Sequence, residues 1–197
     1  MIGLLLLALA QHGPGDSIVY VLAPASRFEL KTGTAGLFGF AGHEHTIRAR
    51  AFTGRIVYRP DSMAASRVEI IVPADSLEVL TPPDTQEIRK VTAAMRTDVL
   101  DVANFPEVLL VSRRIQGGPP RLEMIAALTI RGQTRDVPIS AAVEIGPDTL
   151  RATSTFTIRQ TDFGIRPYRG GPAGTVRVAD RVTVSIRAVA IRQSRER

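Results

Sequence analysis

The chain is dominated by short segments in which apolar and polar residues alternate. In residues 26–32, Phe28 and Leu30 alternate with Arg27, Glu29 and Lys31. This period of two places the apolar side chains on one face and is typical of a half-buried β-strand. Apolar alternation or β-branched runs predict further strands over residues 18–22, 46–58, 66–72, 107–115, 121–130, 137–145 and 150–159.

The last alternating segment is the longest, over residues 176–190. Val and Ile, and then Ala188 and Ala190, hold its even-numbered positions. A long strand that keeps one apolar face fits a curved sheet or a barrel, where that face lies toward the interior along the whole strand.

One segment has the spacing of a helix instead. Asp84 can act as its N-cap and Glu87 follows three residues later, which is a capping-box pattern. Ile88, Val91 and Met95 then form an apolar stripe. A Met in such a stripe is more often a core residue than a ligand contact.

Short Gly- and Pro-containing turns separate the strands, as at residues 116–120, 131–134 and 146–148. Links of hairpin length join antiparallel neighbours. We therefore expect one all-β domain of about nine strands and one helix, built as an antiparallel barrel or sandwich.

The amino-acid composition and the charge exclude several classes of function. Aromatic residues make up 5% of the 197 residues and Trp is absent, so the core must rest on aliphatic residues. The net charge is +6, but the arginines are scattered along the chain, and residues 187–197 hold the one basic run. We therefore expect no nucleic-acid partner. The absence of Cys excludes disulfides, Cys-zinc sites and thiol catalysis.

The N-terminus suggests export. Residues 2–10 are almost wholly apolar and end in Ala8-Leu9-Ala10, which has the form of a signal-cleavage site, although no Lys or Arg precedes the apolar run. We interpret residues 1–10 as a signal peptide and 11–17 as a linker, and expect a periplasmic or secreted protein. The alternative is a short apolar N-terminal strand.

Two kinds of chemistry meet in residues 36–47. His43 and His45 lie two apart, so on a strand they share one face and could form half of a zinc or copper site. Leu37, Phe38 and Phe40 instead suggest the wall of an apolar pocket. No Gly-x-Ser-x-Gly elbow occurs, and we expect no enzymatic activity.

Several segments together resemble the YceI-like family of polyisoprenoid-binding periplasmic proteins. They are Gly42-His43, Phe52-Thr53-Gly54, Asn104-Phe105-Pro106-Glu107, the run Leu-Thr-Ile-Arg-Gly-Gln-Thr at 128–134, the run Arg-Gln-Thr-Asp-Phe-Gly-Ile at 159–165, and Asp180-Arg181-Val182. The resemblance covers residues 18–192, outside the basic tail 193–197.

The resemblance implies a lipocalin-like antiparallel β-barrel with a helix across one end. It also implies an apolar tunnel that binds an isoprenoid or fatty-acid-type lipid without a cofactor, for transport or storage in the cell envelope. Expected partners are this lipid, a transient membrane or envelope partner, and a second copy in a homodimer. A metal-binding protein using His43 and His45 is the alternative. The ligand-contacting residues we expect are Phe28, Leu30, Leu37, Phe38, Phe40, His43, His45, Met95, Phe105, Phe156 and Phe163.

Overall fold

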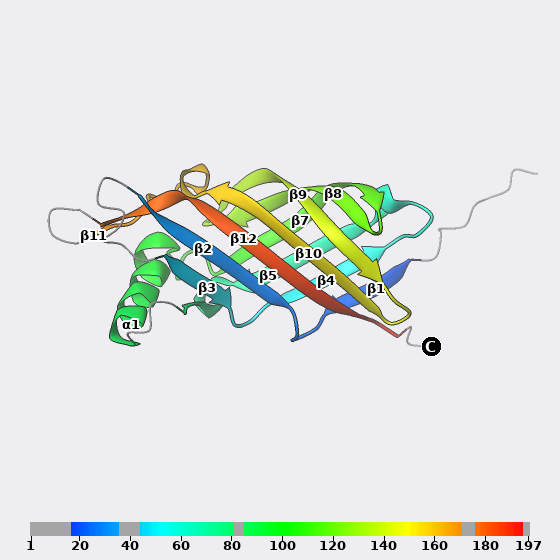
Figure 1. The fold of residues 1–197 in the computed structure, drawn as a ribbon, viewed down its shortest axis with the longest axis horizontal. Helices are drawn as coiled ribbons and strands as arrows, with labels where there is room; N and C mark the ends of the chain where they lie inside the picture. Colours follow the sequence, from blue (N-terminus) through cyan, green and yellow to red (C-terminus); the bar gives the residue numbers. More distant parts are fainter. Residues whose placement is uncertain (1–16, 36–43, 81–84, 171–175, 195–197) are drawn as a thin grey trace, which may run out of the picture.

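The computed structural model describes residues 17–35, 44–80, 85–170 and 176–194, and most of them lie in one antiparallel sheet (Figure 1). No helix in these ranges has both the length and the apolar character needed to cross a membrane. The strands are β1 (Ile18–Leu22), β2 (Arg27–Ala35), β3 (His45–Ala49), β4 (Thr53–Tyr58), β5 (Arg67–Pro73), β6 (Leu77–Val79), β7 (Glu107–Gly118), β8 (Arg121–Ile130), β9 (Gln133–Ile145), β10 (Thr149–Arg159), β11 (Arg169–Gly170) and β12 (Val176–Arg192).

Eight strands close into a barrel. Their order is β1-β4-β5-β7-β8-β9-β10-β12, and β12 pairs back with β1. The 17-residue β12 makes this closure and also pairs along β2, which continues the sheet into β3 and β6. The alternating pattern left an antiparallel barrel or sandwich open, and the structure has the barrel. The antiparallel barrel that the family resemblance implies is thus confirmed.

The predicted helix lies at the end of the barrel where β2 and β3 lie (Figure 1). It is α1 (Thr85–Ala94), followed by a π-helical turn over Met95–Val99. Ile88 and Val91 pack against the core, as their spacing predicts. The predicted cap, Asp84, falls outside the described residues.

Two strand predictions differ from the structure. The segment predicted as one strand over 46–58 is two strands, because β3 pairs with β2 and β6 whereas β4 pairs with β1 and β5. Strand β7 carries an irregularity between Ser112 and Arg114 that shifts its register with β8. A β-bulge of this kind turns the following side chains to the other face, so Leu110 and Ile115 both lie inside.

The hairpin between β8 and β9 turns at Arg131 and Gly132, whose φ angles are 51° and 71°. Two consecutive positive φ values are what a two-residue hairpin loop with the twist of the strands requires. The Phe105 ring covers this turn, and a Cβ on Gly132 would lie 2.8 Å from a ring carbon.

We expect Gly132→Ala to lower the free energy of unfolding by about 1–3 kcal/mol, because the new methyl meets both an unfavourable φ and the Phe105 ring. Urea denaturation measures it. Gly33→Ala is the control, since its Cβ would lie 3.7 Å from the Cβ of Ala179, an ordinary contact. An equal loss of unfolding free energy in the two variants would contradict this explanation of the turn.

Candidate functional site

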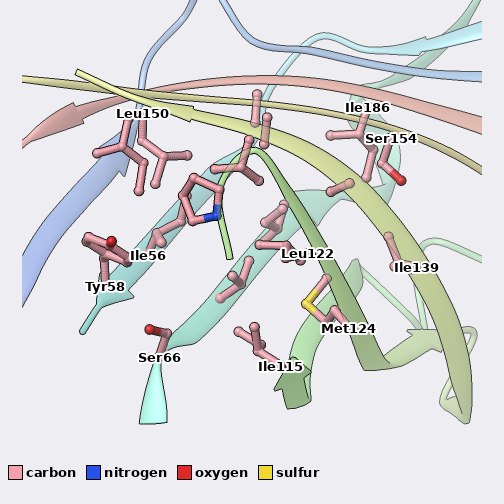
Figure 2. A pocket seen from close by; sticks show the side chains of 18 of the residues that line it. Ile56, Tyr58, Ser66, Ile115, Leu122, Met124, Ile139, Leu150, Ser154 and Ile186 are labelled. Atoms are coloured by element: carbon pink, nitrogen blue, oxygen red, sulfur yellow. The ribbon is translucent and has the colours of Figure 1, made fainter. Parts of the chain in front are cut away.

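The described part of the chain forms two apolar cavities inside the barrel. We call the first the β1-side cavity, because Leu22 of β1 lines it (Figure 2). About 100 Å³ of it is accessible to the centres of water molecules, within about 840 Å³ of empty space that includes its opening to solvent. Its walls come from all eight barrel strands and include Ile56, Leu122, Met124, Ile139, Leu150 and Ile186.

The second, or β2-side, cavity lies toward β2 and the end of the helical segment. About 120 Å³ is accessible to the centres of water molecules, within about 730 Å³ of empty space. Its walls include Phe28, Leu30, Val72, Leu77, Leu100 and Phe156.

The two cavities follow one another along the barrel. On β10, Ala152 and Ser154 line the β1-side cavity, and the next inward residues, Phe156 and Ile158, line the β2-side cavity. The same succession occurs on β5, β7, β8 and β12. Both cavities share the wall residues Ile70, Leu110 and Ile186.

Small side chains leave the space open. Ala141, Ala152, Ser154 and Ala188 all line the β1-side cavity, on three adjacent strands. A barrel of eight strands has room for a ligand when small residues share its interior with large ones.

Three of the polar side chains at these walls, Ser66, Ser154 and Glu29, already have partners. The Ser66 hydroxyl accepts a hydrogen bond from the Arg59 amide at 3.0 Å, and the Ser154 hydroxyl donates one to the Ser140 carbonyl at 2.6 Å. Glu29 forms an ion pair with Arg48. Such walls suit a hydrocarbon chain better than a polar ligand.

Three of the residues predicted to contact a ligand meet at the β2-side cavity. Phe28, Leu30 and Phe156 all line it, from β2 and β10. The Phe28 ring also packs against Phe52, with ring centroids 4.8 Å apart.

Three others lie outside the walls of both cavities. Met95 and Phe163 are packed into the hydrophobic core, and Phe163 is only 1% exposed. Phe105 is half-buried against the Gly132 turn. Their positions fit structural roles.

His45 begins β3 opposite Thr32 of β2, in the register that also pairs Ile47 with Leu30. Cross-strand partners share a face, so His45 lies on the side of the sheet that Leu30 occupies. Among the described residues, no three His, Cys, Asp or Glu side chains are grouped as a metal site would require. The other predicted contacts, Leu37, Phe38, Phe40 and His43, fall outside the described residues, so the histidine pair stays a prediction.

Most of the aliphatic residues that line the two cavities were not among the predicted ligand contacts. Leu122, Met124 and Ile139 lie at alternating positions of predicted strands, so the pattern identified their inward face. The alternating pattern did not indicate that these residues border empty space, because packed and cavity-lining aliphatic residues have the same spacing along a strand.

Comparisons with known proteins agree with this architecture. The model of the YceI-like domain family matches residues 24–190. BcnA from Burkholderia cenocepacia has a similar structure, with a TM-score of 0.66 and 17% sequence identity, over 85% of this chain and 98% of BcnA.

A polyisoprenoid-binding domain from Saccharophagus degradans, implicated in plant cell wall breakdown, gives a TM-score of 0.64 at 10% identity, over 89% of this chain and 98% of that domain. The YCEI protein of Campylobacter jejuni gives 0.57 at 13% identity, over 75% of this chain and 85% of its own. No curated protein matches the sequence. At these identities, the structural likeness establishes the fold.

Proposed function

Since the chain belongs to the YceI-like domain family, we propose that it binds an isoprenoid or another long-chain lipid inside its barrel, without catalysis. The observation that carries the proposal is the pair of apolar cavities that share Ile70, Leu110 and Ile186. Two apolar spaces that follow one another along the barrel and share wall residues fit an extended hydrocarbon chain better than a compact ligand.

The expected driving force is the removal of hydrocarbon from water. Each buried methylene contributes about 0.8 kcal/mol, so a long chain is held without a polar contact. The similar domain from Saccharophagus degradans is described as polyisoprenoid-binding, which supports the same ligand class here. We further propose that the protein transports or stores this lipid in the cell envelope, consistent with the signal-like sequence of residues 1–10.

Native mass spectrometry of gently purified protein tests the proposal. We expect an apolar small molecule to co-purify, and a fluorescent hydrophobic probe to bind once that molecule has been extracted. If no such molecule co-purifies and no probe binds, the proposal fails.

The affinity for linear alcohols is expected to rise with chain length, about fourfold for each added methylene, because each contributes about 0.8 kcal/mol. Displacement of the probe by octanol, decanol and dodecanol, each below its solubility limit, measures the slope. A flat series would indicate that the alcohols bind at the surface and not in the barrel.

A further inference from the structure

The wall of the barrel is incomplete between β9 and β10. In the described chain, the pairing of these strands ends with Ser154 opposite Ala141, whereas β10 stays paired with β12 as far as Arg159. The part of β9 before Ala141 pairs with β8. The two strands therefore separate at Ser154, halfway along β10.

A polar hollow lies on the outer surface at this point. Side chains of Ser140, Thr153, Thr155 and Ser185 bring hydroxyl groups to it, and it is a depression that is open to solvent. Two arginines, Arg121 of β8 and Arg187 of β12, also line it.

The hollow and the interior share part of their walls. Ser154 and Ile186 line both the hollow and the β1-side cavity, and Ile186 also lines the β2-side cavity. Figure 2 shows these two side chains next to each other at one edge of the β1-side cavity. Of the side chains that the structure describes, only that of Ser154, whose hydroxyl donates to the Ser140 carbonyl at 2.6 Å, bridges the two strands by a hydrogen bond here.

The charges around the hollow favour an anion. The Arg121 Nε donates to the Ser140 hydroxyl at 3.3 Å, which directs this guanidinium along the hollow, and Glu123 lies 3.9 Å from the same nitrogen. Arg187 is exposed, and no carboxylate of the described chain forms an ion pair with it. Guanidinium groups with hydroxyl donors between them are suited to phosphate or carboxylate oxygens.

We infer that the ligand is an amphiphile with an anionic head, whose hydrocarbon chain occupies the β1-side cavity and whose head passes the Ser154 opening into the hollow between Arg121 and Arg187. This inference rests on the proposed function. The predicted ligand contact His45 has no part in this site, because it lies on β3 and lines neither the hollow nor the β1-side cavity.

The test compares dodecyl phosphate with dodecanol, which share one chain and differ in the head. The measured quantity is the headgroup preference, defined as the dissociation constant for dodecanol divided by that for dodecyl phosphate. We expect the double variant Arg121→Gln/Arg187→Gln to lower this preference at least about tenfold and to leave dodecanol affinity unchanged, because hydrogen bonds to a charged group are lost.

The matched control is Arg55→Gln/Arg67→Gln. It removes the same charge from exposed positions of β4 and β5, which do not line the hollow, and should keep the wild-type preference. If the headgroup preference fell equally in both double variants, long-range charge attraction alone would explain it, and the inference would be overturned. If the headgroup preference fell in His45→Gln and not in the Arg121/Arg187 variant, the head would lie at the β3 end of the barrel. That result would also overturn the inference.

The two proposals fail in different ways. If the wild-type protein binds neither dodecanol nor dodecyl phosphate, the proposed lipid-binding function fails. If it binds both with equal affinity and the Arg121/Arg187 variant does the same, lipid binding stands and the anionic-head site is refuted.

Discussion

Replacing Ile186 with Phe is expected to weaken the binding of hexadecanol by about a thousandfold while octanol keeps most of its affinity. Ile186 borders both cavities, so a larger ring there is expected to block a hydrocarbon chain that extends from one cavity into the other. A chain confined to one cavity leaves about five methylenes in water, a loss of about 4 kcal/mol. Displacement of a bound hydrophobic probe by each alcohol measures the effect.

Ile191→Phe is the matched control for this experiment. Ile191 lies on the same strand, β12, but is 46% exposed on the outer face. We expect it to bind both alcohols as the wild-type protein does. Thermal unfolding of both variants checks that the barrel stays folded, because overpacking in a closed interior costs about 1–3 kcal/mol. Equal losses for octanol and hexadecanol in Ile186→Phe would show that the cavities do not form one passage.

Phe163→Ala is expected to lower the free energy of unfolding by about 3–5 kcal/mol. The Phe163 ring is 1% exposed within the core, on the 3₁₀ turn that follows β10, so its removal leaves a hole among packed neighbours. Urea denaturation with a linear extrapolation measures this loss.

Phe156→Ala makes the same chemical change at a residue that lines the β2-side cavity. Because one side of that ring already faces empty space, we expect a smaller loss of stability than for Phe163→Ala. Hexadecanol affinity should fall about tenfold with Phe156→Ala, since part of the wall that contacts the chain is gone. The opposite ranking of the two variants in stability would mean that Phe163, and not Phe156, borders the open space.

The outer surface offers a simple check on the role of ion pairs. The exposed pair of Arg113 and Asp136, 2.9 Å apart, joins β7 to β9 across the outer face. Exposed ion pairs contribute about 0–1 kcal/mol, so Asp136→Asn is expected to change the free energy of unfolding by less than about 1 kcal/mol. A larger loss in urea denaturation would show that this pair holds the barrel wall together.

The alternating pattern determined which face of each strand lies inside. On β8, Met124, Leu128 and Ile130 are buried at the positions that period-two spacing assigns to the interior. The same holds for Val182, Ala188 and Ala190 on β12. Turn residues and hairpin-length links then limited the fold to an antiparallel barrel or sandwich, and the family motifs favoured the barrel.

The alternating pattern did not predict local irregularities of the strands, such as β-bulges. The bulge at Ser112–Arg114 moves the inward face of β7 from even to odd positions, so Ile115 lies inside although strict alternation from Leu110 places it outside. The Ser112 hydroxyl accepts the Val68 amide at 2.9 Å beside the bulge, a contact between residues far apart in the chain.

The sequence by itself determined the fold class and the apolar character of the interior, because both follow from local periodicity and composition. Only the tertiary structure decided where the interior is empty: Phe156 faces a cavity and Phe163 is packed, although both were predicted to contact the ligand. Likewise, Arg121, Ser154 and Arg187 gather at one opening because β9 and β10 separate there. Empty space and openings depend on the sizes and spacing of side chains that strands distant in sequence bring together. A local sequence pattern describes one strand at a time, so it does not predict them.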